Sequence, residues 1–197
     1  MMEIIDNFLS KTYFKNISEL VNGPNFEWIY NDNISEPLSS TQFNEYVFSH
    51  LFLVARDEND PSSNRFSPFI EPLLFQILDV TNCDVILIAR ADMVTWSKED
   101  FIHPAHTDFL FPNTAAVFYV NESDGDTIFY NVKRTDVAHY KDLKEYDRVS
   151  PKANRLVIFD GNLLHTGCSP TKHKRRILIN SNYIKKDIYL KNDKNNL

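Results

Sequence analysis

Five stretches of β-forming residues in the second half of the chain constrain its fold more than any other feature. They lie at residues 83–91, 114–121, 125–132, 154–161 and 175–184. Each is short and rich in β-branched and aromatic residues, and polar loops separate one from the next, which is the pattern of successive strands. Their apolar runs are far too short to cross a bilayer. We therefore expect a sheet structure made of many short antiparallel strands.

Helical patterns precede these strands. Residues 2–21 place apolar side chains at steps of mostly three and four residues and then meet the helix-breaking sequence Asn-Gly-Pro, so they predict an amphipathic helix. Residues 66–80 predict a second helix, whereas residues 26–32 and 41–55 have the character of strands. Helices followed by many short strands favour a mostly β fold with flanking helices, a cupin-like jelly roll or double-stranded β-helix.

The length of the chain favours a single domain, residues 1–197. With 197 residues and 43% hydrophobic content, the chain can bury one sizeable core. We expect an N-terminal support of helices and strands at 1–82, a jelly-roll core at 83–183 and a tail at 184–197 that frays. The polar stretches at 55–67 and 92–105 are long and irregular, which suits loops at the rim of a site.

Charge and cysteine content narrow the classes of function. The formal charge of −6 comes from both signs spread along the chain, which argues against broad binding to nucleic-acid phosphates. Cys83 and Cys168 match no disulfide framework and no paired zinc-binding spacing, so a reducing compartment is expected. The start of the chain lacks a basic leader with a cleavage site. We expect a soluble, cytoplasmic protein of cellular or viral origin, without a membrane or nucleic-acid partner.

The sequence HPAHTDF at residues 103–109 contains the first candidate metal ligands. His106 and Asp108 are two positions apart, so on an extended strand they project from the same face. A neutral imidazole and an ionised carboxylate together suit a divalent transition metal such as iron(II). His103 is out of phase with them across Pro104, and we expect it to be a solvated loop histidine.

Two later features add to this candidate site. His165 follows a buried apolar run and stands near a turn at Gly167, where it can face the sheet interior as a ligand. Arg175 and Arg176 open the last strand, and one of them is expected to face inward, because a buried arginine needs an anion such as a carboxylate. Two histidines and one carboxylate leave about three of six octahedral positions open, enough for a bidentate 2-oxo acid and dioxygen.

These residues carry a resemblance to a known family. The HTD sequence, the histidine of LLHTGCSP and the arginine of RRILINSNY look like those of the iron(II)/2-oxoglutarate-dependent dioxygenases, in particular the prolyl 4-hydroxylase-like branch. The order of the intervening segments is also similar, with FYVN at 118–121, DGDTIF at 124–129 and PKANRLVIF at 151–159. The resemblance covers residues 83–183, and the N-terminal part is similar to many microbial and phage members.

The resemblance implies a metal site and a co-substrate site. The iron(II) ligands that it implies are His106, Asp108 and His165. The 2-oxoglutarate anchor is Arg176 rather than Arg175, because the family places this basic residue four positions before an asparagine, which this chain has at position 180.

The same resemblance implies the reaction and its other participants. Tyr119 is a further candidate contact for 2-oxoglutarate, and Trp96, in a polar loop, is a candidate wall of the substrate pocket. Dioxygen is the second co-substrate, and ascorbate is a candidate reductant. The implied reaction hydroxylates a C–H bond and releases succinate and CO2. A prolyl residue of a peptide or protein is the substrate closest to the resemblance, and a free amino acid, another small molecule or an asparagine of a protein stays open.

The chain also departs from the family pattern, which keeps two alternatives open. Asp124 replaces the first glycine of a turn whose acid is Asp126, and the segment ILIARAD lacks the tyrosine that often contacts 2-oxoglutarate. A nucleic-acid demethylase is expected to have a further arginine just after the last strand, and this chain has none there, which argues against that class of enzyme. One alternative is a non-catalytic metal-binding jelly-roll module. The other is a zinc site that includes Cys168, three residues after His165.

Overall fold

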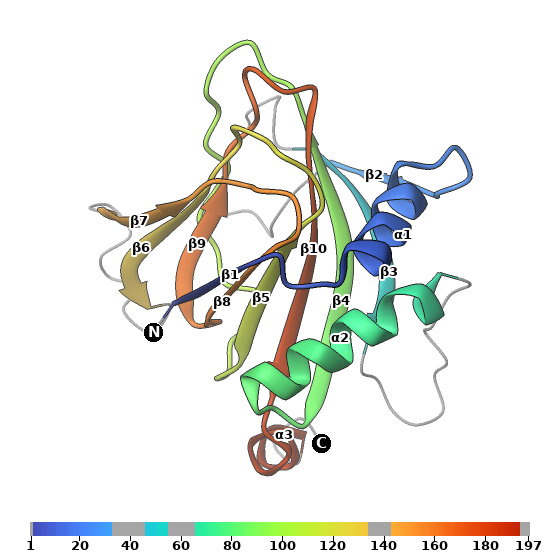
Figure 1. Cartoon of the computed structure of the whole chain (residues 1–197). Helices are drawn as coiled ribbons and strands as arrows, with labels where there is room; N and C mark the ends of the chain where they lie inside the picture. Colours follow the sequence, from blue (N-terminus) through green and yellow to red (C-terminus); the bar gives the residue numbers. More distant parts are fainter. Residues whose placement is uncertain (1, 33–45, 55–65, 134–142, 194–197) are drawn as a thin grey trace.

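Two antiparallel sheets form the body of the molecule in the computed structural model, which describes residues 2–32, 46–54, 66–133 and 143–193 (Figure 1). The larger sheet has seven strands in the order β1-β8-β5-β10-β4-β3-β2, and the smaller has three in the order β7-β6-β9. In that order, the strands of the larger sheet are Glu3–Asp6, Arg155–Asp160, Thr114–Tyr119, Arg175–Ile184, Val85–Thr95, Val47–Val54 and Ile29–Asn31. Those of the smaller sheet are Glu145–Val149, Thr127–Lys133 and Leu163–Gly167. The sheets confirm the predicted jelly roll with flanking helices.

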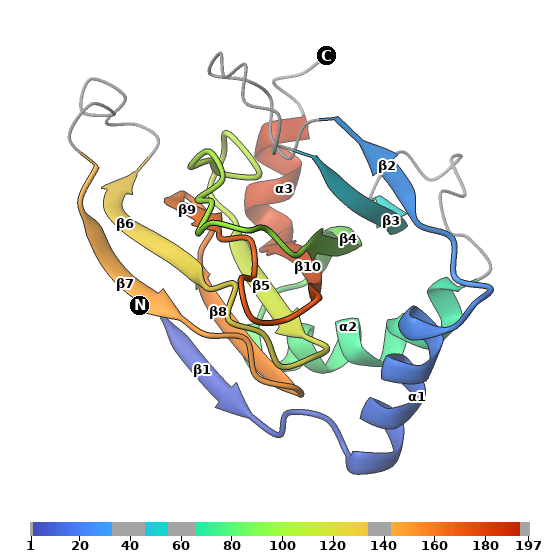
Figure 2. The same ribbon diagram turned by 90° about the horizontal axis from the view of Figure 1, so that it is seen from above.

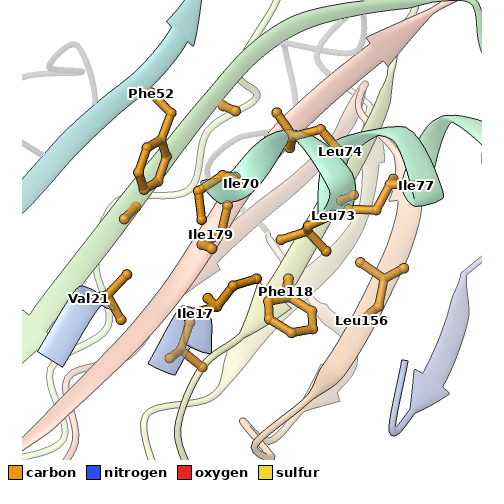
Figure 3. Packing of buried hydrophobic residues seen from close by; sticks show 14 of the residues in the cluster. Ile17, Val21, Phe52, Ile70, Leu73, Leu74, Ile77, Phe118, Leu156 and Ile179 are labelled. Atoms are coloured by element: carbon orange, nitrogen blue, oxygen red, sulfur yellow. The ribbon is translucent and has the colours of Figure 1, made fainter. Parts of the chain in front are cut away.

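Helices α1 (Lys11–Asn22) and α2 (Ser67–Thr81) cover one face of the larger sheet, and the short α3 (Lys186–Asp193) lies at one end of it (Figure 1). Figure 3 shows apolar side chains of both helices meeting those of the sheet in one buried cluster, among them Ile17 of α1 and Ile70 of α2. Burying an aliphatic side chain of this size stabilises the fold by about 1.5–3 kcal/mol. Among the described residues, no helix has the length and apolar character that crossing a membrane requires.

Strand β10 separates this helix-facing core from the space between the two sheets. Ile177 and Ile179 join the cluster beneath the helices, whereas Leu178 joins a second cluster between the sheets. Because successive side chains of a strand point to opposite faces, Arg176 and Asn180 share the inner face with Leu178, and all three line an internal cavity. The alternation of β10 therefore brings charged and amide groups between the sheets.

The prediction of one helix over residues 2–21 is wrong in its first part. Glu3–Asp6 forms strand β1, which pairs with the edge of β8, and helix α1 begins only after Ser10. The Ser10 side chain accepts a hydrogen bond from the backbone N–H of Tyr13 (3.4 Å), as an N-cap does. The apolar residues before Ser10 are too few to distinguish a helix from a strand. The segment forms a strand because the edge of β8 is open to pair with it.

Other boundaries also differ from the prediction. The tail does not fray at once: it forms α3, where the N–H of Lys186 donates to Asp84 Oδ2 (3.0 Å). Strand β7 escaped prediction because four of its five residues are exposed and lack apolar alternation. The loop predicted at 92–105 begins later, since β4 continues to Thr95. Most of the loop predicted at 55–67, up to residue 65, lies outside the described residues.

Asn154, just before β8, holds the N-terminal segment through its side chain. Its Nδ2 donates to the carbonyl of Leu9 and its Oδ1 accepts from the N–H of Leu9, both at 2.9 Å in a buried position. Its φ is 64°, in the left-handed region. We expect Asn154→Ala to lower the free energy of unfolding by about 2–4 kcal/mol, because two buried hydrogen bonds are lost and alanine disfavours this backbone conformation.

Urea unfolding of Asn154→Ala and Asn154→Gly measures the two contributions separately. Glycine loses the same hydrogen bonds but accepts the left-handed conformation, so Asn154→Gly should be about 1 kcal/mol more stable than Asn154→Ala. Equal stability of the two variants would contradict the backbone part of this explanation.

Candidate metal and co-substrate site

A cavity of about 560 Å³, counting its open mouth, lies between the two sheets. Strands β3, β4, β5, β6, β9 and β10 contribute to its walls, together with the segment that carries His103 and His106. The view from above places β4, β5 and β10 in the middle of the molecule, between the helices and the smaller sheet (Figure 2).

The three candidate metal ligands lie close together, and two of them, His106 and His165, line this cavity. One ligand atom each of His106, Asp108 and His165 lies within 4.8 Å of the others. His106 and Asp108 belong to an irregular segment rather than to the extended strand expected for them, and His165 lies in the middle of β9 rather than near a turn. An isolated β-bridge joins His106 to His165, with N–H···O distances of 2.9 and 3.0 Å in the two directions. This bridge brings together residues that are far apart in the sequence.

Backbone carbonyls orient both imidazole rings. Nδ1 of His106 lies 3.2 Å from the carbonyl oxygen of Pro104, and Nδ1 of His165 lies 3.0 Å from that of Leu163. A carbonyl oxygen only accepts, so each Nδ1 carries a proton, which in a neutral ring leaves the lone pair on Nε2. The two Nε2 atoms lie 3.9 Å from Oδ1 and Oδ2 of Asp108, too far for hydrogen bonds. Three acceptor atoms thus face one another, an arrangement typical of metal ligands.

Asparagine amides hold the carboxylate of Asp108. Nδ2 of Asn182 donates to Asp108 Oδ2 (3.0 Å) and also to Oδ1 of Asn113 (3.0 Å), while Nδ2 of Asn180 lies 3.5 Å from Asp108 Oδ1. Burial opposes ionisation of Asp108, but positive charge on the His165 and His106 rings when they are protonated, the hydrogen bond from the Asn182 amide and the charge of Arg90 together lower the pKa of the carboxyl group. Burial, and then the neighbouring His165, lowers the pKa of His106. An ionised carboxylate beside a neutral imidazole is the protonation state that metal binding needs.

Arg176 lies at another part of the same cavity and is 5% exposed. Its Nη2 donates to Thr127 Oγ1 (2.6 Å), whose hydroxyl lies 2.5 Å from that of Tyr119. The Tyr119 ring lies beneath the guanidinium, with Cζ 5.8 Å from its centroid, but Tyr119 itself does not line the cavity. Arg175 is exposed on the opposite side of β10, where its Nη2 donates to Asn22 Oδ1 (2.6 Å).

Glycines make the room that Arg176 and Asn113 occupy. The chain has only 4 glycines, so each position is informative. A Cβ at Gly167 would lie 2.6 Å from Nη1 of Arg176, and one at Gly125 would lie 2.5 Å from the carbonyl oxygen of Cys168 and 3.1 Å from Cδ of Arg176. A Cβ at Gly161 would lie 2.0 Å from Oδ1 of Asn113. Three of the four glycines therefore clear space around the site.

His103 is buried, so the expectation of a solvated loop histidine is wrong. The side chain is 3% exposed and lines the cavity, and Nε2 lies 3.1 Å from Ser169 Oγ. Burial, and then the charge of Arg176, lowers the pKa of His103 to about 3, so the ring is neutral. Trp96, in contrast, is exposed and lines a separate outer hollow. Cys168 is buried and does not belong to the group of candidate ligands found among the described residues, so it does not support a zinc site with His165.

Asp124, in the turn before β6, has a clear structural role. The carboxylate of Asp124 accepts hydrogen bonds from the backbone N–H groups of Thr171, Lys172 and His173, at 2.9–3.1 Å. Burial works against the charge, but hydrogen bonds from His173 and Thr171 hold the pKa of Asp124 well below its usual range. Asp124 therefore ties the turn before β6 to the loop that leads into β10.

Two charged cavity residues were absent from the sequence prediction. Arg90 and Asp92 of β4 line the cavity as an ion pair, with Nε and Oδ1 2.7 Å apart. The signal was present in ILIARAD, where both charges alternate with alanines and so share one face of a strand.

No family model and no curated protein matches the sequence. Solved structures do match. The chain is similar to a prolyl hydroxylase from Trichoplax adhaerens, solved with a peptide fragment of the hypoxia inducible factor oxygen degradation domain, with 13% identity and a TM-score of 0.63 over 96% of this chain and 86% of that one. It is also similar to a 2OG-Fe(II) oxygenase family oxidoreductase from Burkholderia pseudomallei, with 11% identity and a TM-score of 0.66 over 93% and 85% of the two chains.

A third similar structure is HygX from Streptomyces hygroscopicus with nickel and 2-oxoglutarate bound. The identity is 10% and the TM-score 0.59, over 94% of this chain and 83% of that one. At such identities the likeness concerns the arrangement of the elements. This chain therefore has the jelly-roll fold of the 2OG-Fe(II) oxygenases and prolyl hydroxylases.

Proposed function

We propose that this protein is an iron(II)- and 2-oxoglutarate-dependent oxygenase that hydroxylates a C–H bond of a prolyl residue or an amino-acid-like substrate and releases succinate and CO2. The observation that supports this most is that two histidines and a buried arginine line one cavity, with the carboxylate of Asp108 beside the two histidines. Two of the similar structures agree with it, since one holds nickel and 2-oxoglutarate and the other a peptide.

His106, Asp108 and His165 would hold the metal. Two imidazole nitrogens and one carboxylate are the donor set that non-haem iron(II) takes. Two ligands about 2.1 Å from one ion lie at most about 4.2 Å apart. Each Nε2 lies 3.9 Å from an oxygen of Asp108, and all three ligand atoms lie within 4.8 Å, so a small approach of the side chains would close them on one ion. When bound, iron(II) supplies the redox chemistry that couples decarboxylation of 2-oxoglutarate to hydroxylation of the substrate.

Arg176 would bind the far carboxylate of 2-oxoglutarate. Thr127 fixes one of its Nη groups, while its Nε is buried without a hydrogen-bond partner among the described residues. A buried guanidinium with an unpaired N–H is costly, and a carboxylate satisfies it with charge-assisted hydrogen bonds. Tyr119 would act through Thr127 and the guanidinium that it supports rather than by direct contact.

Asn182 would position Asp108 as a ligand. We expect Asn182→Leu to weaken iron(II) binding about 10- to 100-fold, because the carboxylate loses the amide that fixes its direction. Anaerobic titration with iron(II) measures this. Ser181→Ala is the matched control, because Ser181 is equally buried on the other face of β10 and bonds to Tyr183. A metal affinity that is the same in both variants would remove Asn182 from the site.

Turnover of the co-substrate tests the proposed function directly. Protein purified without oxygen is mixed with iron(II), ascorbate and 2-oxoglutarate, oxygen is admitted, and succinate is quantified with and without pools of peptides and amino acids. Succinate formation that a pool stimulates establishes the oxygenase and indicates its substrate class. Metal binding without any succinate would instead establish a non-catalytic metal-binding module.

A further inference from the structure

The charge pair of β4 is a part of the cavity that the proposed function leaves without a role. Arg90 and Asp92 line the cavity together with Val94, whereas Ala89, just before Arg90, and Ala91, between the two charges, are fully buried beneath the helices. Strand alternation explains this division, since every second side chain points to the same face. Both charges therefore belong to the inner face of the larger sheet.

The register of β4 against β10 locates this pair within the cavity. Arg90 lies opposite Asn180, and Val94 lies opposite Arg176. Asn180 is the residue whose amide approaches Asp108, so Arg90 stands beside the candidate metal ligands. The position of Arg90 along the strands is four residues, or about 13 Å, from that of Arg176. The two arginines thus belong to different parts of the cavity.

The pair is open to a ligand on its arginine side. Asp92 is 8% exposed, whereas the side chain of Arg90 is 32% exposed. Among the described residues, Asp92 is the one ion-pair partner of Arg90, and it takes Nε. The carboxylate of Asp92 raises the pKa of Arg90, and burial opposes this. Because the guanidinium of Arg90 is partly exposed and both side chains line the cavity, the pair is available to a ligand that enters it.

Charge balance indicates the kind of ligand. Iron(II) and Arg176 bring three positive charges, and Asp108 and doubly ionised 2-oxoglutarate bring three negative ones, so that part of the site is neutral when loaded. The Arg90–Asp92 pair is also neutral, but it presents a positive and a negative group side by side. Such a pair complements a ligand that is itself a dipole, and a free α-amino acid carries an ammonium and a carboxylate on one carbon.

We propose that Arg90 and Asp92 bind the carboxylate and the ammonium group of a free α-amino acid, so that the substrate class is a zwitterionic amino acid. This deepens the proposed function and rests on it. A residue inside a peptide has neither charge and would leave the pair without partners in the cavity. Arg90 lies beside the candidate metal ligands, so an amino acid whose carboxylate binds to Arg90 has its carbon atoms close to the metal.

Binding without turnover tests this proposal. Nickel-loaded protein with 2-oxoglutarate, kept free of oxygen, is mixed with a pool of the proteinogenic amino acids and examined by ligand-observed NMR. The same pool is tested as N-acetyl derivatives, as carboxamides and as blocked tripeptides. We expect one or more free amino acids to bind, and the derivatives that lack either charge to bind at least about 10-fold more weakly. Binding of blocked tripeptides alone, or of no member of the free pool, overturns the proposal.

Variants assign the binding to the pair. Arg90→Met should lower the affinity for the amino acid about 10- to 100-fold. Because this change leaves a lone buried carboxylate, the double variant Arg90→Met/Asp92→Leu, which removes both charges, is measured as well and should lose the same affinity. Arg175→Met removes an equal charge from the outer face and should bind as the wild type does. Wild-type affinity in the double variant overturns the proposal.

Titration of the wild type with 2-oxoglutarate separates this proposal from the proposed function. Absence of 2-oxoglutarate binding contradicts the proposed function, while the amino-acid signal is still read in the same sample. If Arg90→Met lowers the affinity for 2-oxoglutarate as much as the affinity for the amino acid, the pair belongs to the co-substrate site and the amino-acid proposal is overturned.

Discussion

Replacing His165 with alanine is expected to abolish turnover and to weaken iron(II) binding by more than about 100-fold. Loss of an outer hydrogen-bond partner of a ligand already costs about 10- to 100-fold in metal affinity, and His165 would be a ligand itself. Its Nε2 faces Asp108 at 3.9 Å, and no other imidazole can replace it from β9. Anaerobic iron(II) titration and succinate formation measure the two effects.

The loss must be separated from a general loss of stability. His165 is buried and its ring packs against that of Phe159, with centroids 4.8 Å apart, so the alanine variant also leaves a cavity. His50→Ala is the matched control. His50 is a buried histidine of β3 that packs against Phe26 and Phe52, and its Nδ1 lies 2.7 Å from the carbonyl oxygen of Glu27. His50→Ala should lower stability but keep metal affinity, and a His165→Ala variant that still binds iron(II) tightly would remove His165 from the ligand set.

Replacing Arg176 with lysine is expected to raise the KM for 2-oxoglutarate about 10- to 150-fold. Lysine keeps the positive charge but loses the planar fork that binds a carboxylate at two points, and such a charge-assisted interaction is worth about 1.5–3 kcal/mol. The hydrogen bond from Nη2 to Thr127 is also lost. The dependence of succinate formation on 2-oxoglutarate concentration measures KM, and direct titration measures the affinity.

Arg175→Lys is the control for this effect. Arg175 has the same chemistry one position earlier, but it is exposed and bonds to Asn22 on the helix side of the sheet. Its substitution should leave the KM for 2-oxoglutarate unchanged. A larger effect at Arg175 than at Arg176 would mean that β10 is shifted by one residue in solution, which would turn every one of its side chains to the other face.

Some expectations failed because local patterns do not decide short or polar segments. Ile4 and Ile5 are compatible with a helix or a strand, and pairing with β8 selects the strand. Strand β7 has almost no apolar alternation and exists because β6 offers it hydrogen bonds. His103 has no sequence signal that distinguishes it from a solvated histidine, and its contacts with Thr166, Gly167 and Ser169, far along the chain, accompany its burial.

The sequence by itself determined the features that depend on period and spacing. The run of short strands indicated the jelly roll, and the alternation of RRILIN placed Arg176 and Arg175 on opposite faces, because side chains of a strand alternate with a period of two. The tertiary structure alone decided which distant groups meet. The bridge between His106 and His165, the amides around Asp108, the glycines that clear space for Arg176 and the place of Arg90 and Asp92 in the cavity all depend on pairing between strands far apart in the chain. Such pairing follows from the burial of the whole sheet and not from any local run of residues.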